Sequence, residues 1–183
     1  MMSLSNDNFI PLAIAVLTVS DTRDLARDTS GQYLVDALIA YGHHLAARAL
    51  VKDDIYQIRA QVSQWIADGQ INAIIVTGGT GFSGRDSTPE AIIPLLDKRI
   101  DGFGELFRHL SLEDIGTSTI QSRAFAGLAN FTLISCLPGS TGACRTGWEN
   151  ILAPQLDARQ KPCNFVGHLL AKPGCATRAN QDD

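Results

Sequence analysis

Three short segments of this chain are apolar almost throughout, and they constrain its fold more than any other feature. They are residues 12–19 (LAIAVLTV), 72–76 (NAIIV) and 131–137 (FTLISCL). Each is as long as a strand, and its lack of polar alternation is typical of a strand covered on both faces. Such strands occur in parallel sheets with helices packed on each side. The segments therefore predict an α/β fold with a buried, mostly parallel sheet.

Segments with helical periodicity lie between these strands. Residues 30–41 repeat apolar side chains on one face and are followed by Gly42, which suits the residue after a helix. Residues 54–68 have the same period and end before Gly69. A further strand is expected over residues 45–51, between the two helices. This alternation of strands and helices predicts a doubly wound sheet with right-handed crossovers.

The second half of the chain has a less regular pattern. Residues 88–96 and 103–110 predict helices, and residues 142–156 predict a helix that continues at least to Pro154. Residues 115–129 fit either a helix or an edge strand, and the pattern does not decide between them.

The length and composition fit one globular domain. The chain has 183 residues, of which 45% are hydrophobic and 19% charged, enough to bury a core. We expect this domain over residues 11–170, after an N-terminal extension at 1–10 and before a disordered tail at 171–183. The N-terminus does not resemble a signal peptide, and no apolar segment is long enough to cross a membrane. A cytoplasmic protein without membrane contact is therefore expected.

Charge and metal-binding residue types exclude some functions. Fifteen basic against nineteen acidic residues give a net charge of −4, which argues against a broad nucleic-acid surface. The four cysteines lack the C-x-x-C spacing of zinc sites, and we expect reduced thiols. The histidines show no metal-binding spacing, and no Ser-His-Asp or Cys-His pattern is evident. A nucleophilic side chain is thus not predicted.

Polar loops follow each expected strand. In an open parallel sheet the carboxyl ends of the strands meet at one edge, where ligands bind. The first strand is followed by Ser20, the second by Lys52, Asp53 and Asp54, and the last by Pro138, Gly139 and Ser140. The third is followed by the richest loop, which begins Thr77, Gly78, Gly79, Thr80, Gly81. These loops predict one shared ligand site.

The Gly-rich loop at residues 77–81 suits an anionic ligand. Its glycines let the backbone approach a ligand closely, and a helix beginning near Pro89 would add a favourable dipole. Residues 79–84 match the dinucleotide pattern G-x-G-x-x-G, but the helix starts too late and the loop follows the third strand. A dehydrogenase is therefore disfavoured. The phosphate-binding pattern G-x-x-x-x-G-K-S/T also fails, because Arg85 follows Gly84.

Several charged residues near these loops have two interpretations. Asp86 could cap the following helix, or it could hold Mg²⁺ against substrate phosphates. Ser87 can cap that helix by itself and has capping-box spacing with Glu90, which would leave Asp86 for a ligand. Asp53 and Asp54 could complement the dipole of their helix or belong to the site. The side chains that could either neutralise phosphates or remain surface charges are Lys52, Arg85 and Arg145.

In order and spacing, these motifs resemble the MoaB/MogA family of molybdenum cofactor biosynthesis proteins. The segments concerned are 17–21 (LTVSD), 28–31 (DTSG), 77–91 (TGGTGFSGRDSTPEA), 102–105 (GFGE), 116–119 (GTST) and 137–140 (LPGS). The likeness extends from about Pro11 to Phe165. Residues 143–157 are similar to the MoaB branch in particular.

This resemblance implies a three-layer α/β/α molybdopterin-binding fold, assembled as a homotrimer or homohexamer. It implies adenylylation of molybdopterin with Mg-ATP, in which the terminal phosphate of molybdopterin attacks the α-phosphorus and pyrophosphate leaves. Asp53 and Asp86 match the two catalytic aspartates of the family, with Asp86 as the Mg²⁺ ligand. Ser20 and residues 77–81 would hold pterin or phosphate, and the loop of Pro138, Gly139 and Ser140 would line the nucleotide side.

The implied chemistry fits the residues present. Phosphoryl-type transfer requires mainly positioning and charge neutralisation, and the substrate supplies its own nucleophile. The alternative is a non-catalytic molybdopterin-binding or scaffold protein, because the same domain type occurs within the scaffold protein gephyrin. Other molybdenum cofactor biosynthesis proteins are further expected partners.

Overall fold

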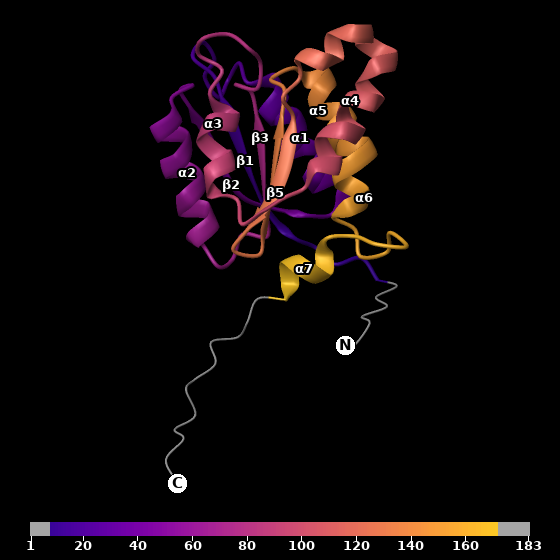
Figure 1. Cartoon of the computed structure of the whole chain (residues 1–183). Helices are drawn as coiled ribbons and strands as arrows, with labels where there is room; N and C mark the ends of the chain where they lie inside the picture. Colours follow the sequence, from indigo (N-terminus) through magenta and orange to yellow (C-terminus); the bar gives the residue numbers. More distant parts are fainter. Residues whose placement is uncertain (1–7, 172–183) are drawn as a thin grey trace.

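A six-stranded sheet forms the centre of the molecule (Figure 1). The structure is a computed structural model that describes residues 8–171. The expected N-terminal extension falls outside this range except for residues 8–10, and the expected tail falls outside it except for Ala171. None of the helices within the described range is long and apolar enough to span a membrane.

The sheet is parallel except at one edge. Its order is β2-β1-β3-β6-β5-β4. The first four strands run parallel to one another, β5 runs antiparallel to β6, and β4 runs antiparallel to β5. The strands are β1 (Ala13–Val19), β2 (His44–Val51), β3 (Ala73–Thr77), β4 (Lys98–Arg99), β5 (Phe125–Ala129) and β6 (Thr132–Leu137). The predicted mostly parallel sheet is confirmed, and three of its strand ends lie side by side in β1, β3 and β6.

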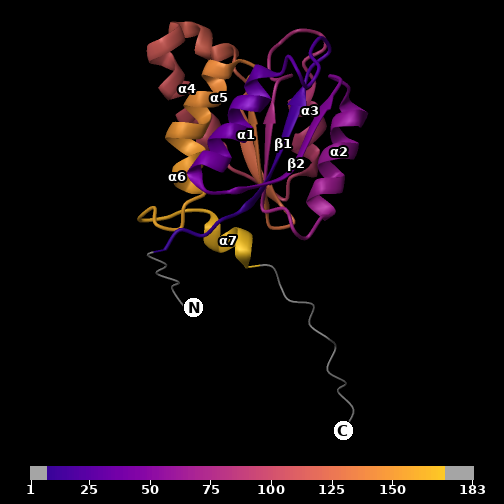
Figure 2. The ribbon, with the colours of Figure 1, turned by 180° about the vertical axis from the view of Figure 1, so that it is seen from behind.

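Helices cover both faces of the sheet (Figures 1 and 2). One face carries α2 (Ile55–Ala67), α3 (Thr88–Ile92) and the 3₁₀ turn η1 (Ile93–Leu95). The other carries α1 (Thr29–Tyr41), α4 (Asp101–Ile115), α5 (Thr141–Gly147), the π-helical turn η3 (Trp148–Leu152) and α6 (Ala153–Gln155). A 3₁₀ helix, η2 (Gly116–Gln121), follows α4, and α7 (Val166–Leu170) lies near the described C-terminal end. The three-layer α/β/α architecture is as predicted.

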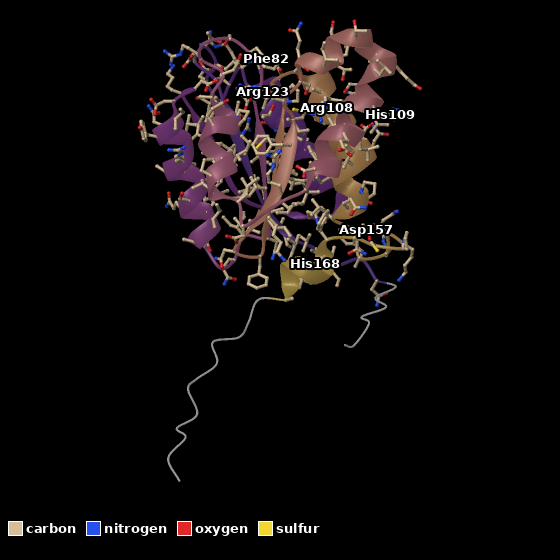
Figure 3. The ribbon with its side chains drawn as sticks, in the orientation of Figure 1. Phe82, Arg108, His109, Arg123, Asp157 and His168 are labelled. Carbon is tan, nitrogen blue, oxygen red and sulfur yellow. The ribbon has the colours of Figure 1, made fainter. Side chains whose placement is uncertain are left out.

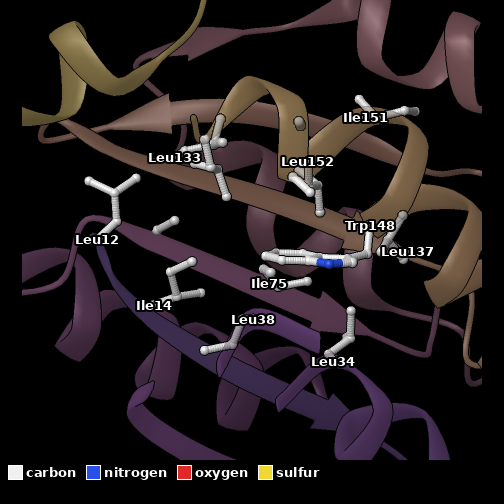
Figure 4. Packing of buried hydrophobic residues seen from close by; sticks show 14 of the residues in the cluster. Leu12, Ile14, Leu34, Leu38, Ile75, Leu133, Leu137, Trp148, Ile151 and Leu152 are labelled. Carbon is white, nitrogen blue, oxygen red and sulfur yellow. The ribbon is translucent and has the colours of Figure 1, made fainter. Parts of the chain in front are cut away.

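Alternate residues of each central strand point to different helix layers. Ile14 and Ile75 pack with Trp148 on the face of α1 and α5, as the close-up in Figure 4 shows. Their strand neighbours Leu17 and Ile74 pack in the second cluster, under α2 and α3. Both faces are therefore buried, which is why the strand sequences show no polar alternation.

Four expected elements have other bounds or another type in the structure, and the expectation that the helix from residue 142 continues to Pro154 is confirmed. Residues 88–96 form a short α3 that passes into a 3₁₀ turn, and residues 103–110 belong to the longer α4. Residues 115–129 form η2 and then β5, so neither a continuous helix nor an edge strand is correct, because β4 takes the edge. The helix from residue 142 passes Pro154 after a π-helical turn, whose altered hydrogen-bond pattern accommodates a residue without an N–H.

Candidate functional site

A cleft of about 520 Å³ opens at the carboxyl ends of β1, β3 and β6. It lies between the loops that follow these strands, the edge at which open parallel sheets bind ligands. The lining includes every residue expected to contact the ligand, namely Ser20, Thr77, Gly78, Gly79, Thr80, Gly81, Pro138, Gly139 and Ser140, together with Asp86. The structure thus brings these predicted residues together. Asp53 is not among the lining residues.

The Gly-rich loop turns sharply where β3 ends. Gly78 and Gly79 have φ angles of 103° and 64°, which disfavour any residue with a Cβ. A Cβ on Gly78 would also lie 2.2 Å from the carbonyl oxygen of Val19. The amide of Gly78 donates to the carbonyl of Leu137 at 3.0 Å. Gly139 also lies close to Gly78, since a Cβ added to Gly139 would be 3.2 Å from the Cα of Gly78. The loops after β3 and β6 therefore meet at the bottom of the cleft.

Thr77 joins this contact to the helix behind it. Its hydroxyl donates to the carbonyl of Pro138 at 3.1 Å and lies 3.1 Å from the sulfur of Cys144. Burial raises the pKa of the Cys144 thiol to about 11, so the thiol is protonated at neutral pH. Cys144 is therefore a packing residue and supplies no nucleophile to the cleft.

Asp86 presents the one carboxylate among the described residues that line the cleft. One oxygen, Oδ2, accepts a hydrogen bond from the amide of Ser83 at 2.7 Å. The N-cap of α3 is Ser87, so the interpretation of Asp86 as its cap is wrong. The other oxygen, Oδ1, has no hydrogen-bond partner within residues 8–171, and the carboxylate remains available to a ligand or cation.

Asp53 has a different role from Asp54 beside it. Asp54 caps α2, because its carboxylate accepts from the amides of Tyr56 and Gln57. The Asp53 carboxylate turns toward the Gly-rich loop and accepts from the amide of Ser87 at 3.0 Å and from its hydroxyl at 2.5 Å. Asp53 thus fastens the loop after β2 to the start of α3, behind the cleft.

The capping box expected between Ser87 and Glu90 does not form. Ser87 makes no side-chain cap bond, since its hydroxyl donates to Asp53. Glu90 forms an ion pair with Arg123. The amide of Ser87, which would donate to Glu90 in a capping box, therefore donates to Asp53.

Arg123 binds the Gly-rich loop from the opposite side. Its Nε donates to the carbonyl of Gly81 at 2.8 Å, and its Nη2 donates to the carbonyl of Asp86 at 2.8 Å. Its Nη1 pairs with Glu90, and the face of Phe82 lies 5.1 Å from the guanidinium carbon (Figure 3). One guanidinium therefore connects both ends of the segment that carries Asp86.

Arg23 is the one cation among the described residues that line the cleft. Its Nη1 donates to the hydroxyl of Ser30 at 3.0 Å and to the carbonyl of Gly139 at 3.1 Å. Its backbone amide donates to the hydroxyl oxygen of Ser20 at 3.1 Å. These bonds hold the loop after β1 against the loop after β6.

A buried carboxylate supports this part of the cleft from below. Asp28 caps α1 and accepts from Thr18, from the amide of Gly31 and from Arg48 at 2.7, 2.9 and 3.1 Å. Burial by itself would raise the pKa of Asp28, but the hydrogen bonds from Thr18, Gly31 and Arg48 outweigh it and leave the pKa below its usual range. The charge of Asp28 is therefore satisfied internally.

The three cations considered from the sequence do not line the cleft. Lys52 donates to the carbonyl of Asp21 at 2.6 Å, and Arg85 pairs with the Asp21 carboxylate at 2.7 Å. Arg145 lies over the ring of Tyr33 at 5.4 Å. The interpretation as surface charges is therefore favoured for all three.

Sequence reasoning missed Arg23 and Arg123. Arg23 follows Ser20 within the same polar loop, so its proximity to an expected site residue was a usable signal. Arg123 lies in the segment whose secondary structure the sequence left undecided. Its contacts to residues 81–90 depend on the pairing of β5 with β6, which places the start of β5 beside the Gly-rich loop. No local sequence pattern predicts such a contact.

The fold and the cleft define a class: three-layer α/β proteins that bind a small polar ligand beyond the ends of a parallel sheet. Residues 15–158 match the family model described as "Probable molybdopterin binding domain". Molybdenum cofactor biosynthesis protein B of Escherichia coli (strain K12) is 58% identical over 168 residues, covering 92% of this chain and 99% of that protein. The chain belongs to the MoaB family of molybdenum cofactor biosynthesis proteins.

More distant relatives agree. The protein of the same name from Staphylococcus epidermidis is 47% identical over 150 residues, covering 80% of this chain and 85% of its own. The solved structure of the tungsten cofactor synthesizing protein MoaB from Pyrococcus furiosus is 34% identical, with a TM-score of 0.70, and the match covers 78% of this chain and 91% of that one. The fold predicted from the resemblance is thus confirmed.

Proposed function

We propose that this chain binds molybdopterin in the cleft and adenylylates it with Mg-ATP in the cytoplasm. The observation that carries the proposal is the convergence of the Ser20, Gly-rich and Pro138–Ser140 loops, with Asp86 on one wall. The cleft contains hydroxyls, backbone amides, one carboxylate and one guanidinium. Such a set suits a reaction that needs orientation and charge neutralisation.

In the proposed reaction, a phosphate oxygen of molybdopterin forms a bond to the α-phosphorus of ATP. The bond between that phosphorus and the oxygen bridging to the β-phosphate breaks, and pyrophosphate leaves. The nucleophile belongs to the substrate, which agrees with a protonated, buried Cys144 beside the cleft. The glycine backbone and the loop of residues 138–140 orient the two reactants.

Magnesium fits Asp86 as a partner. Within residues 8–171, no group of three or more His, Cys, Asp or Glu side chains could hold a metal by itself. Mg²⁺ is commonly held by one or two carboxylates together with substrate phosphates, and Asp86 has an unpartnered oxygen for this. When bound, the ion would supply positive charge to the phosphates.

A second candidate function is molybdopterin binding without catalysis, as in a scaffold protein. One observation favours it: Asp53, the second expected catalytic residue, does not line the cleft and is engaged by Ser87. The two candidates share the ligand and differ in the turnover of ATP.

Adenylyl-molybdopterin formation, followed by chromatography, separates them. We expect product with wild type and a rate at least about 100-fold lower for Asp86→Asn, the scale of a lost electrostatic contact. Asp21→Asn is the matched control, since Asp21 pairs with Arg85 and does not line the cleft. Molybdopterin binding without product in wild type would establish the second candidate. An unchanged rate in Asp86→Asn would remove the magnesium role.

We also propose that the protein is a homotrimer or homohexamer. We expect the apolar helix at residues 103–110 to contribute to the interface through its exposed side chains, because its Phe103 and Phe107 are buried in the core of the chain itself. Leu106 on the same helix is 43% exposed and remains available. Sedimentation should give a trimer or hexamer that Leu106→Glu weakens, and a monomer at micromolar concentration would contradict the proposal.

A further inference from the structure

The guanidinium of Arg23 is held in place but only partly used. Its Nη1 bonds to Ser30 and Gly139 fix the position of the group between two loops. Its Nε and Nη2 have no hydrogen-bond partner within the described residues, although the side chain lines the cleft. Of the described ion pairs, none includes Arg23, whereas Arg27 in the same loop pairs with Asp24.

Two hydroxyls beside Arg23 also have a proton to donate. The oxygen of Ser20 accepts from the amides of Thr22 and Arg23, and the oxygen of Ser140 accepts from the amide of Ala143. Both oxygens therefore act as acceptors, and neither O–H donates a hydrogen bond within the described part of the chain. Both serines line the cleft.

The nearest buried negative charge does not cancel this set of donors. Asp28 lies behind Ser30, whose hydroxyl donates to it at 3.3 Å. Its charge is satisfied by Thr18, Gly31 and Arg48, and it forms no ion pair with Arg23. A guanidinium with two free N–H groups in one plane matches two oxygens of a phosphate better than any point charge does.

We propose that Arg23, Ser20 and Ser140 form a phosphate subsite, in which Nε and Nη2 of Arg23 bind two oxygens of one phosphate group. The ligand class is a phosphate monoester or the phosphate of a nucleotide. This inference deepens the proposed function, because it assigns the anionic part of the ligand to the loops after β1 and β6. Asp86 would then hold Mg²⁺ against the phosphates that lie beside the Gly-rich loop.

Inorganic pyrophosphate tests the subsite without any turnover. Titration calorimetry in low salt without magnesium should show binding to wild type and at least about tenfold weaker binding to Arg23→Gln. Arg23→Lys should also bind about tenfold more weakly, because an ammonium cannot form the two parallel bonds. Arg27→Gln is the matched control, with the same charge change in the same loop on a side chain that is 72% exposed, and should bind as wild type does.

Any of three results would overturn the subsite. The affinity for pyrophosphate could fall equally in Arg23→Gln and Arg27→Gln, it could be unchanged in Arg23→Gln, or wild type could bind no pyrophosphate. Melting temperatures within about 2 °C of wild type would exclude misfolding as the cause of a loss. Adenylylation is measured separately: its absence with Arg23-dependent pyrophosphate binding would remove the proposed function and keep the subsite.

A second titration identifies which phosphate binds there. AMP and molybdopterin are each titrated into wild type and Arg23→Gln. A tenfold loss for molybdopterin alone assigns the subsite to the pterin phosphate, and a loss for AMP alone assigns it to the nucleotide. An unchanged affinity for both ligands would contradict the subsite.

Discussion

The carboxylate of Asp53 accepts two hydrogen bonds from Ser87, one from the amide at 3.0 Å and one from the hydroxyl at 2.5 Å. This pair connects the loop after β2 to the start of α3 across the sheet edge. Gly79 allows the approach, since a Cβ there would lie 2.6 Å from Oδ2 of Asp53. Asp53 therefore shapes the Gly-rich loop from behind, whatever further part it takes in chemistry.

Removing this carboxylate should separate its structural and chemical roles. We expect Asp53→Ala to lower the free energy of unfolding by about 1–2 kcal/mol, because two donors of Ser87 lose their acceptor. Asp54→Ala is the control, since it removes the N-cap of α2 at similar cost. Urea unfolding and adenylylation are measured on both. If Asp54→Ala lost activity as strongly as Asp53→Ala, the effect on activity would be attributed to stability alone.

The backbone at Gly78 should tolerate no side chain. Gly78→Ala combines a positive φ of 103° with a Cβ 2.2 Å from the carbonyl oxygen of Val19. We expect a loss of at least about 2 kcal/mol in unfolding free energy. Gly84→Ala, in the same loop, places its Cβ in open space and should change stability by less than about 0.5 kcal/mol. Similar losses in the two variants would show that the loop conformation differs from the one described.

Arg123 should control the mobility of the loop that carries Asp86. Arg123→Lys keeps the charge but cannot reach the carbonyls of Gly81 and Asp86 together with Glu90. Hydrogen exchange should therefore become faster in residues 80–90 and stay unchanged in the strands. Arg85→Lys, at an exposed pair with Asp21, is the control and should leave the exchange of β3 and α3 unaltered. If residues 80–90 exchanged at the same rate in Arg123→Lys as in wild type, the bridging role of Arg123 would be contradicted.

His43 should make the protein less stable in weak acid. Burial, with a smaller contribution from His44 and opposed by Asp157, lowers the pKa of His43 to about 4, compared with about 6.5 in an unfolded chain. The folded state therefore favours neutral His43, and this stabilisation is complete above pH 6.5 and lost as the pH falls toward 4. We expect about 2 kcal/mol less unfolding free energy at pH 5 than at pH 7 from this group.

Urea unfolding at the two pH values checks this. His43→Gln should be less stable than wild type at pH 7 but should show a smaller difference between pH 7 and pH 5. His44→Gln, at an exposed neighbour, should keep the wild-type difference. A full pH difference retained in His43→Gln would assign the effect to other groups.

Sequence patterns predicted the strands and the converging loops because both depend on local composition. An apolar run such as residues 72–76 has few alternatives to a buried strand, and the loop after it must then reach the carboxyl edge. The assignments that failed depend on partners distant in the sequence. Glu90 has capping-box spacing with Ser87, yet Arg123 and Asp53 compete for the two residues through the tertiary fold. Arg123 was missed for the same reason, because its bonds to Gly81 and Asp86 join segments that are distant in the sequence.

The enclosed thiol of Cys144 has a consequence for how the cleft withstands oxidation. Peroxides and alkylating agents react with the thiolate form, and Cys144 is fully buried under Thr77 and protonated at neutral pH. The exposed Cys163 is the more reactive of the two. A thiol-directed fluorophore at Cys163 would therefore leave the floor of the cleft chemically unchanged.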